Sequence, residues 1–347
     1  MAIGGLLVLV ACTETSGPAD VGVVATLTPA PAIGTVADVH VEAPDGADVT
    51  IEVAEAGGPT RRFVATPAEH GGYDALLAGL AADVAYTWRA VASFPDGEVR
   101  TADEVFHTAP QPAWAPLLAV EPPVDPWAPG FVGSTLLGAD AAYVVLDAQG
   151  RYVWWWRPDE AYMVNNARLA RGGRSVLVLL ADADMREDLG TLVEVGLDGE
   201  VIAETAAPGA HHDFVETPDG GIVYLAFDTR PWDGEDTIGD RLARLERTTG
   251  VTETLWSSWD ALSPTRPDAP DIYSFGRDWT HANGLALDPV SGDWLVSLHN
   301  LDAVVRIAWD GALRWQMGGA GSDLAVVGDE GFAFQHSPSF GAEDEVL

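Results

Sequence analysis

The sequence predicts an all-β protein whose larger part is a β-propeller, and two observations lead to this fold class. The first is a repeated sequence pattern. It begins with a polar segment that contains a histidine, and a short apolar strand, a Pro/Asp/Gly turn and a second apolar strand follow. It occurs at residues 211–220, 281–289 and 335–341. The second is a set of short turns between later apolar runs, two of them Asp-Gly, a strong hairpin signal. Spaced repeats with four short strands each are typical of propeller blades.

The second half of each predicted blade is a hairpin. The turns at Asp198-Gly199, Thr249-Gly250 and Asp310-Gly311 join residues 192–195 to 201–203, 244–246 to 252–256 and 303–307 to 313–315, respectively. Blades are related by rotation about one axis, so residues at the same place in successive blades form a ring. His212, His281 and His336 all stand at the predicted entry to a first strand, the strand nearest the channel. We therefore expect them to converge on one mouth of that channel.

The N-terminus, residues 1–20, is predicted to be a lipoprotein signal peptide and tether. Ala2 to Ala11 form an apolar stretch that is too short to span a membrane and ends in small residues. Cys12, the only cysteine, stands where bacterial lipoproteins, which this stretch resembles, are lipidated. This predicts an exported protein, periplasmic or at the cell surface, that meets the membrane only through a lipid anchor. The alternative is a buried N-terminal strand with an incidental cysteine.

Residues 21–110 are predicted to form a separate β-sandwich. Short alternating runs between turn residues have the spacing that a sandwich of this size requires. Residues 77–88 resemble the leucine-to-tyrosine corner of fibronectin type III domains, and residues 105–110 resemble their last strand. Residues 111–130, rich in Pro and Trp, are predicted to be an extended linker. The propeller then takes residues 131–347.

Composition limits the possible partners and the available chemistry. The formal net charge of −35 argues against binding to nucleic acid or to anionic membrane surfaces. All 18 basic residues are arginine, so no lysine is available as a base or Schiff-base former. A fixed cation in a site is therefore an arginine or a protonated histidine.

Three imidazoles at one channel mouth are compatible with three kinds of site. The first kind is a zinc site, in which neutral histidines and Asp213 are the ligands. In the second, protonated histidines and Asn283 donate hydrogen bonds to a tetrahedral oxyanion while one further imidazole attacks as a nucleophile. In the third, the histidines cap turns and bind nothing. The spacing alone leaves all three open.

Three ordered phrases in matching blade positions resemble the bacterial aryl-sulfate sulfotransferases. They are residues 211–213, residues 281–283 followed by 295–307, and residues 334–336. The resemblance implies an N-terminal β-sandwich-like domain and a six-bladed propeller. It also implies transfer of a sulfuryl group from a phenolic sulfate ester to another phenol by a ping-pong route. Such transfer uses no nucleotide sulfate donor, no metal and no other cofactor, and the partners are small aryl sulfates and phenols.

The same resemblance assigns roles to individual residues. It implies that His336 is the nucleophile that becomes transiently sulfated. It implies that His212, with His211 as the alternative, binds the sulfuryl oxygens or protonates the leaving phenol. His281 and Asn283 would hold the oxyanion as its charge develops, which suits the need for convergent donors around a nucleophile.

Two departures from the family pattern bear on these roles. His299 stands where the family carries a sulfate-binding arginine, so either anion affinity at neutral pH falls or the role passes to Arg277. Leu347 falls within a predicted strand, and a closed propeller needs further blades. We therefore expect the chain to be a fragment of its gene product, with the propeller incomplete at the C-terminus.

Two other functions remain as alternatives. A non-catalytic extracellular propeller that binds a ligand or a protein partner would keep the architecture without the arginine. A metal-dependent hydrolase of the lactonase or quinoprotein type ranks last, because the sequence lacks the acidic ligand set that such propellers carry at their axis.

Overall fold

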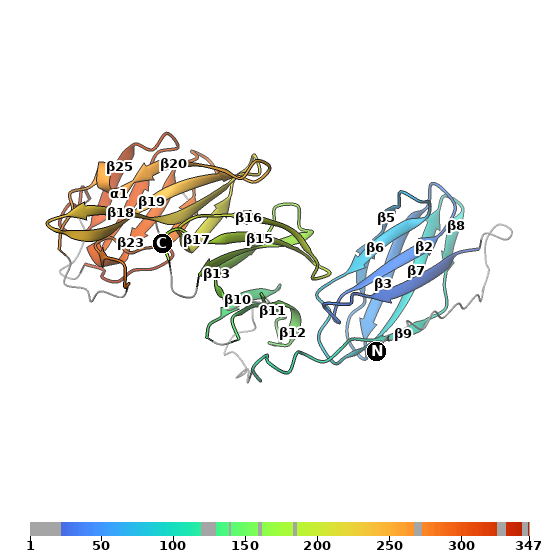
Figure 1. The fold of residues 1–347 in the computed structure, drawn as a ribbon. Helices are drawn as coiled ribbons and strands as arrows, with labels where there is room; N and C mark the ends of the chain where they lie inside the picture. The colour runs from blue at the N-terminus through green and yellow to red at the C-terminus, as the bar shows by residue number, and fades with distance from the viewer. Residues whose placement is uncertain are drawn as a thin grey trace. The chain divides into compact units, whose positions relative to one another are not determined.

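A computed structural model describes residues 22–118, 130–138, 140–158, 162–182, 186–266, 273–324, 331–341 and 346 (Figure 1). Strands dominate these residues, which confirms the predicted all-β class; the helices described are α1 (Ser258–Ala261) and the 3-10 helix η1 (His299–Leu301). The predicted signal peptide with Cys12, and residues 119–129 of the predicted linker, lie outside the described residues. No helix in the part of the chain just given is long and apolar enough to cross a membrane.

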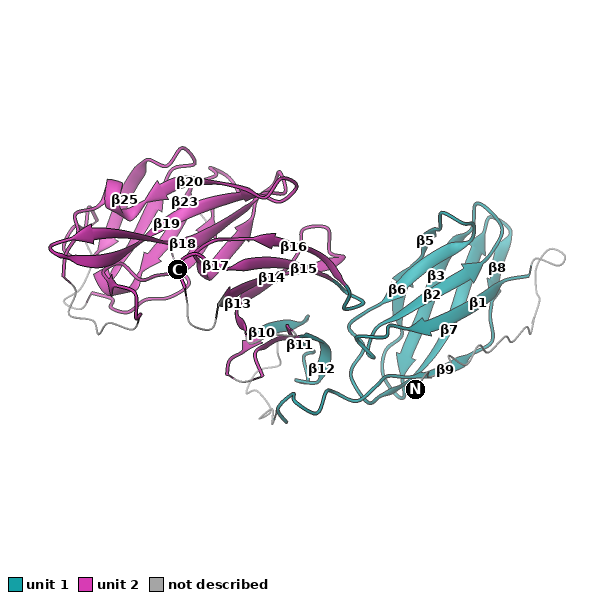
Figure 2. Cartoon of the chain, in the orientation of Figure 1, with its two compact units in different colours: residues 1–134, 144–156, 196–200 teal, residues 135–143, 157–195, 201–347 magenta. Residues whose placement is uncertain are grey.

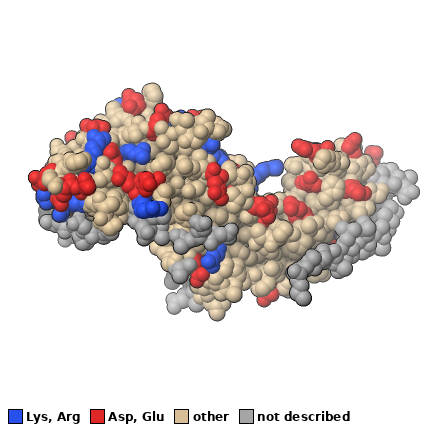
Figure 3. Space-filling view, viewed as in Figure 1, with Lys and Arg blue, Asp and Glu red and all other residues tan. Residues whose placement is uncertain are grey.

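The chain divides into two compact units, coloured separately in Figure 2. The first comprises residues 1–134, 144–156 and 196–200, and the second comprises residues 135–143, 157–195 and 201–347. On the face drawn in Figure 3, carboxylate side chains are spread over much of the described surface, as the net charge of −35 requires.

The first unit contains a two-sheet β-sandwich. One sheet has the order β1-β2-β6-β5, and the other has the order β4-β3-β7-β8 with β9 also paired to β7. The strands are β1 (Val24–Pro29), β2 (Ala37–Glu42), β3 (Asp48–Glu55), β4 (Arg61–Val64), β5 (Thr66–Pro67), β6 (Tyr73–Leu77), β7 (Ala85–Phe94), β8 (Gly97–Arg100) and β9 (Glu104–His107).

Alternation of apolar and polar residues builds this sandwich. In β2 every second residue is buried, so Val39 and Val41 enter the core shared by both sheets while their neighbours face solvent. The buried Tyr86 accepts a hydrogen bond at its hydroxyl from Ala81 N, 2.8 Å away and five residues upstream. A tyrosine corner has this arrangement. The fibronectin type III assignment itself stays a prediction.

A three-stranded sheet of order β10-β11-β12 follows, with β10 (Val132–Leu136), β11 (Ala142–Leu146) and β12 (Tyr152–Trp156). Within the first unit, β12 bonds to loops of the sandwich. Thr35 Oγ1 donates to Val153 O over 2.7 Å, and Ala82 N donates to Tyr152 O over 2.8 Å. These bonds explain why β12 belongs to the compact unit of the sandwich.

The second unit contains three consecutive antiparallel sheets whose four main strands follow chain order, as in propeller blades. The turns predicted at Asp198-Gly199, Thr249-Gly250 and Asp310-Gly311 each join two paired strands, which confirms those hairpins. The strands are β13 (Tyr162–Leu169), β14 (Ser175–Asp182), β15 (Thr191–Gly196) and β16 (Val201–Ala206); β17 (Ala210–Glu216), β18 (Ile222–Trp232), β19 (Glu235–Glu246) and β20 (Val251–Ser257); and β22 (Ala282–Leu287), β23 (Trp294–Leu298), β24 (Ala303–Ile307) and β25 (Leu313–Gly318).

The β18–β19 hairpin is long, and its tip crosses an acidic, Gly-rich stretch of the sequence. The two strands stay paired from Ile222↔Leu245 to Trp232↔Glu235. At the tip, Asp233 and Gly234 both have positive φ, 50° and 87°, which suits the tight turns that hairpins favour. A short strand, β21 (Arg277–Asp278), pairs in parallel with β19 and brings residue 278 beside Ile238.

A β-bulge interrupts the first strand of each of the three sheets. The register shifts between Val164 and Asn166 in β13, between His211 and Phe214 in β17, and between Ala282 and Gly284 in β22. A bulge turns side chains away from the regular ladder, and such irregularities are common next to functional sites. The bulged residues are Asn165 in β13, His212 and Asp213 in β17, and Asn283 in β22. His281 stands at the entry to its first strand, as predicted, because it directly precedes β22, whereas His212 lies inside β17 at the bulge.

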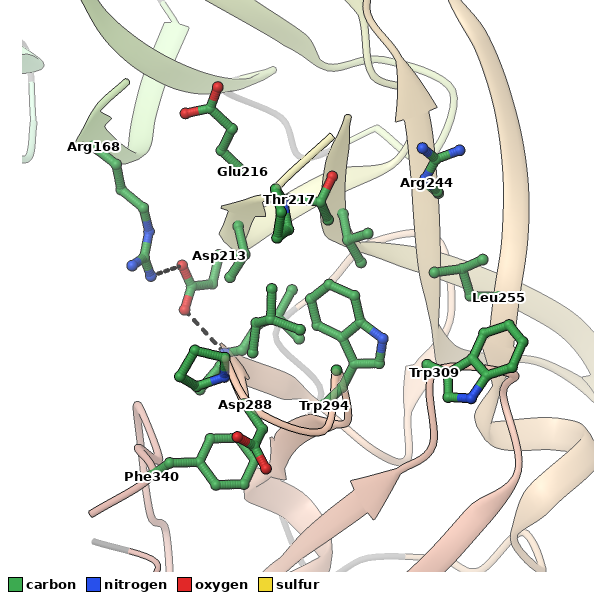
Figure 4. Close-up of a pocket in the computed structure, with 18 of the residues that line it drawn as sticks. Arg168, Asp213, Glu216, Thr217, Arg244, Leu255, Asp288, Trp294, Trp309 and Phe340 are labelled. Atoms are coloured by element: carbon green, nitrogen blue, oxygen red, sulfur yellow. Dashed lines mark hydrogen bonds and ion pairs between the residues drawn. The ribbon is translucent and has the colours of Figure 1, made fainter. Parts of the chain in front are cut away.

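Asp213 joins the first strands of all three sheets. Its Oδ1 accepts hydrogen bonds from Asn166 Nδ2 (2.6 Å), Arg168 NH2 (2.8 Å) and Phe214 N (2.8 Å), and its Oδ2 accepts one from Leu285 N (2.9 Å). Figure 4 shows this carboxylate between Arg168 and the backbone of β22. The residue is buried, so its charge is balanced by these donors rather than by bulk water.

Candidate functional site

The structure brings four of the predicted histidines together in the second unit. The ring centroid of His212 lies 5.0 Å from that of His281 and 6.1 Å from that of His336. The ring of His299 lies 5.1 Å from that of His281. Below, these four residues are called the histidine cluster.

Two of these histidines have a backbone conformation that non-glycine residues rarely adopt. His212 and His281 have φ values of 53° and 51°, in the left-handed region. This geometry costs free energy unless the surrounding structure imposes it, and such residues concentrate at functional sites. At His212 the β17 bulge imposes it; at His281 the chain turns from β21 into β22.

A buried carboxylate holds His281. Asp278 Oδ1 accepts from His281 N (2.9 Å), and Oδ2 lies 2.5 Å from His281 Nδ1. Burial alone would lower the pKa of His281, but the hydrogen bond and the charges of Asp278 and Asp240 outweigh it, so the pKa is raised above its usual value. Burial raises the pKa of Asp278 as well, and the bond to His281 opposes that rise. His281 is therefore the member of the cluster best suited to carry a proton.

His211 lies beneath the cluster, fully buried. Its ring stacks on Phe227 with centroids 4.2 Å apart. Its Nε2 lies 2.9 Å from Asp240 Oδ1, an ion-pair distance without the alignment of a good hydrogen bond, and its Nδ1 lies 2.9 Å from His212 Nδ1. The structure thus separates His211, predicted as a possible substrate ligand, from solvent and couples it to His212.

His212 and His336 are both disposed to stay neutral. Burial first, and then the charges of the neighbouring histidines, hold the pKa of His212 well below its usual value. Burial also lowers the pKa of His336, reinforced by His281 and His299 and opposed by Asp213. His336 is nevertheless solvent-exposed, and because its Nδ1 lies 2.8 Å from Ser337 Oγ, Nε2 is the ring nitrogen left for a reaction.

The segment that carries His336 is seated on β22. Asn283 Nδ2 donates to Gln335 O over 3.0 Å, and the Asn283 side-chain oxygen accepts from Ser297 Oγ. A Cβ atom at Gly284 would lie 2.5 Å from Ser337 N, so the chain passes too close to β22 for any side chain at that position. Asn283 is buried, and its bonds give it the role of fixing the segment beside His336.

The two residues considered as replacements for the family arginine occupy different surroundings. His299, in η1, belongs to the cluster, and its Nδ1 lies 2.9 Å from Asn300 Oδ1. Arg277, in β21, donates from Nε to Glu235 Oε1 over 2.9 Å. Its guanidinium is thus engaged by a carboxylate, whereas His299 lies directly against His281.

Aromatic side chains border the histidines on two sides. Tyr273 stacks on His281 with ring centroids 6.0 Å apart and an interplanar angle of 19°. Phe334 lies 4.9 Å from His299, and 66% of its surface is exposed. Asp302 Oδ1 accepts from Phe334 N over 3.0 Å, which holds the backbone of this exposed residue. Such flat apolar surfaces suit an aromatic ligand.

Two residues of the site, Asp278 and Asp240, had not been predicted. Asp278 precedes His281 by three residues, a spacing that can be noticed in the sequence once a partner is sought. Asp240 is placed by the register of β19, for which no local signal exists. Asn165, at the β13 bulge, has a buried Nδ2 that finds no acceptor among the residues described, so this donor remains available for a ligand.

The second unit has a cavity of about 1310 Å³, and Figure 4 draws residues that line it. Its wall includes Trp294 and four residues that are close in sequence to residues of the site, namely Asn166, Asp213, Leu285 and Ser337. No histidine is among the residues that line it. Within the described ranges, no group of three or more His, Cys, Asp or Glu side chains is arranged to hold a metal ion.

Comparison with known proteins yields one family and several distant structures. The model of the family described as Arylsulfotransferase (ASST) matches residues 131–323. No curated protein matches the chain. One similar solved structure is a protein of unknown function from Bacteroides caccae, with 14% identity over 63% of this chain and 64% of that chain and a TM-score of 0.37. Another is the calcium-binding protein regucalcin from Agrobacterium tumefaciens, with 14% identity over 74% of each chain and a TM-score of 0.38. A third is virginiamycin B lyase from Staphylococcus aureus, with 12% identity over 86% of this chain and 81% of that chain and a TM-score of 0.37. The chain thus spans about 64% of the length of the first of these.

The family match covers the three sheets of the second unit and three of the four clustered histidines, His212, His281 and His299. Because residues 131–323 make up more than half of the 347-residue chain, the protein belongs to the arylsulfotransferase (ASST) family.

Proposed function

We propose that the protein transfers a sulfuryl group from a phenolic sulfate ester to a phenol, in two steps, through a sulfohistidine at His336. The observation that carries this proposal is a cluster of four imidazoles, three of which have pKa values shifted in opposite directions. Asp278 raises the pKa of His281 against the effect of burial, whereas burial lowers the pKa values of His212 and His336. A site that holds an acid beside a neutral nucleophile is suited to group transfer.

In the first half-reaction, the Nε2 lone pair of His336 attacks the sulfur of the ester. The bond between sulfur and the aryl oxygen breaks, and protonated His281 gives its proton to that oxygen, so that a neutral phenol leaves. Hydrogen-bond donors around the transferring group stabilise the charge on the sulfuryl oxygens. Tyr273 and Phe334 offer faces for the aryl ring.

In the second half-reaction, an acceptor phenol loses its proton to a base of the cluster, and its oxygen attacks the sulfur. The bond between sulfur and His336 Nε2 breaks, and its electron pair returns to the imidazole. His336 is thereby restored to the neutral form in which it started.

The proposal is tested by incubating the protein with 4-nitrophenyl sulfate, with and without phenol. We expect steady release of 4-nitrophenol that requires phenol, parallel-line kinetics in the two substrates, and an enzyme 80 Da heavier, by mass spectrometry, when the acceptor is withheld. Phenol-independent release would indicate hydrolysis instead. A folded protein that binds phenols without releasing any 4-nitrophenol would be a binding module.

Replacing Asp278 by asparagine is expected to lower the pKa of His281, because burial then acts without the opposing carboxylate. With phenyl sulfate, whose leaving group needs protonation, kcat should fall about 10²-fold or more. A proton donor is lost as the pH rises through its pKa, so the alkaline limb of the pH profile should move to lower pH. 4-Nitrophenyl sulfate, with its better leaving group, should be affected less.

The matched control for this substitution is Asp310→Asn, at the exposed turn between β24 and β25, where the carboxylate accepts from Ala312 N. It should leave both substrates and the pH profile unchanged. An Asp278→Asn profile that coincides with the wild-type profile would show that His281 is not the acid.

We further propose, from the pattern at residues 2–12, that the protein is exported and anchored through Cys12.

A further inference from the structure

Asp240, His211 and His212 form a row of polar contacts that the function proposed above leaves unused. Asp240 and His211 are each 1% exposed, so water is almost excluded from both. Asp240 Oδ2 accepts from Thr280 Oγ1 and from Ala282 N, both over 2.6 Å. This leaves Oδ1 to face His211 Nε2 at 2.9 Å.

The position of one proton follows from this arrangement. A lone pair on His211 Nε2 would lie close to the carboxylate oxygen, 2.9 Å from the nitrogen, which is electrostatically unfavourable in a buried site. An N–H group at Nε2 instead meets a negative charge. We therefore place the proton of the His211 imidazole on Nε2, which leaves a lone pair on its Nδ1.

The next contact then fixes the tautomer of His212. The Nδ1 atoms of His211 and His212 are 2.9 Å apart, a distance at which one must donate and the other accept. Because His211 Nδ1 carries the lone pair, His212 Nδ1 carries the proton. Neutral His212 thus has a bare Nε2, the ring nitrogen that is not bound to His211, beside His281 and His336.

We propose that Asp240 and His211 are positioning residues that hold His212 with a bare Nε2, and that His212 thereby accepts the proton of the acceptor phenol in the second half-reaction. This inference rests on the proposed sulfuryl transfer. Of the two tasks that the family resemblance implies for His212, it disfavours binding of the sulfuryl oxygens, which a lone pair repels, and it favours proton exchange with a phenol, whose hydroxyl a lone pair accepts.

The proton balance closes over one cycle. The phenol O–H bond breaks, an N–H bond forms at His212 Nε2, and the phenol oxygen takes the sulfuryl group from His336. His212 then passes the proton to His281, which lost its own proton to the first phenol. The ring centroids of His212 and His281 are 5.0 Å apart. The proton moves from His212, whose pKa is lowered, to His281, whose pKa is raised.

The groups that face His212 are His211, His281, His299 and His336, and Asp240 acts on it through His211. The positive charge that His212 gains is unfavourable next to the other imidazoles, so it is short-lived. The Asp240 carboxylate offsets part of it, as the buried aspartate does in serine proteases.

Replacing Asp240 by asparagine should move the proton of His211, and in turn the proton of His212, to the other ring nitrogen. The amide oxygen can still accept from Thr280 and Ala282, which turns the amide N–H toward His211 Nε2. His211 then carries its proton on Nδ1, and His212 carries its proton on Nε2. The comparable exchange in serine proteases leaves the geometry intact and lowers kcat about 10⁴-fold by trapping the wrong tautomer.

The kinetic test treats the two half-reactions separately. The first is the burst of 4-nitrophenol without acceptor; the second is the loss of the sulfated form, by mass spectrometry, after an acceptor is added. In Asp240→Asn we expect the burst to change little, because 4-nitrophenol leaves readily even when His281 loses the charge of Asp240, and we expect desulfation by phenol to be slower by about 10²-fold or more. Desulfation by pentafluorophenol, which is already ionised at neutral pH, should be nearly unchanged. Equal losses in both steps and with both acceptors would indicate structural damage and overturn the proposal.

A spectroscopic test does not depend on turnover. Nitrogen-15 shifts of the wild-type histidines, with His212 identified by the signals missing from His212→Asn, should show a protonated Nδ1 and a bare Nε2. A proton on Nε2 in the wild-type protein would overturn the inference even if the enzyme is active. If the wild-type protein releases no 4-nitrophenol, the proposed function fails, and the shifts still decide the tautomer.

Discussion

Replacing His336 by alanine is expected to lower kcat for sulfuryl transfer by at least about 10⁴-fold, because a two-step transfer loses the atom that carries the group between substrates. The residue is exposed, so the substitution opens no cavity in the core. Release of 4-nitrophenol, with and without phenol, measures the effect. Mass spectrometry of the protein without acceptor should show no added sulfuryl group.

The matched control is His70→Ala, an exposed histidine of the sandwich, which should leave both measurements unchanged. Peptide mapping of the wild-type protein provides the decisive comparison. If sulfate is found on the peptide of His212 or His281, or if His336→Ala retains its burst, another imidazole is the nucleophile.

Replacing Asp213 by alanine is expected to lower the free energy of unfolding by about 3–5 kcal/mol, as breaking other buried ion pairs does. The substitution leaves Asn166 Nδ2 and Leu285 N without their acceptor and Arg168 without its buried partner. Because these groups belong to two sheets and Asp213 belongs to a third, the loss should appear as a less cooperative transition of the second unit.

Chemical denaturation, followed by tryptophan fluorescence, measures this loss. Asp260→Ala is the control, since its carboxylate, with 73% of the side chain exposed, pairs with Arg230 at the surface. Such exposed pairs contribute about 0–1 kcal/mol. A loss of the same small size in Asp213→Ala would mean that the three first strands are held together by packing alone.

Local signals in the sequence predicted the parts of the fold that depend on local chemistry. Asp198-Gly199 and Asp310-Gly311 fix their hairpins because these residue types favour the backbone angles that a tight turn requires. Asp233-Gly234 carries the same signal within an acidic, Gly-rich stretch, and it too closes a hairpin, β18–β19. The turn residues are thus a better guide than the composition of the residues around them.

The repeat indicated which histidines meet, but it did not indicate how they are held. The clustering of His212, His281 and His336 follows from their places in successive blades. The sequence did not predict that Asp240 and Asp278 lie beside the histidines, because the register of β19 with β18 and β21 determines where they lie. A bulge shifts a side chain by one position without any residue type that announces it, so the different registers of His212 and His281 could not be predicted.

The bulges in β13, β17 and β22 also bear on how such a site can change over evolutionary time. Asn165, His212 and Asn283 lie outside the regular ladder, so exchanging their side chains leaves the strand pairing of each sheet intact. The apolar residues on either side, such as Val164, Phe214 and Leu285, are fully or almost fully buried and tolerate little change. One framework can therefore acquire new anion chemistry by substitution at a few bulged positions while its core stays constant.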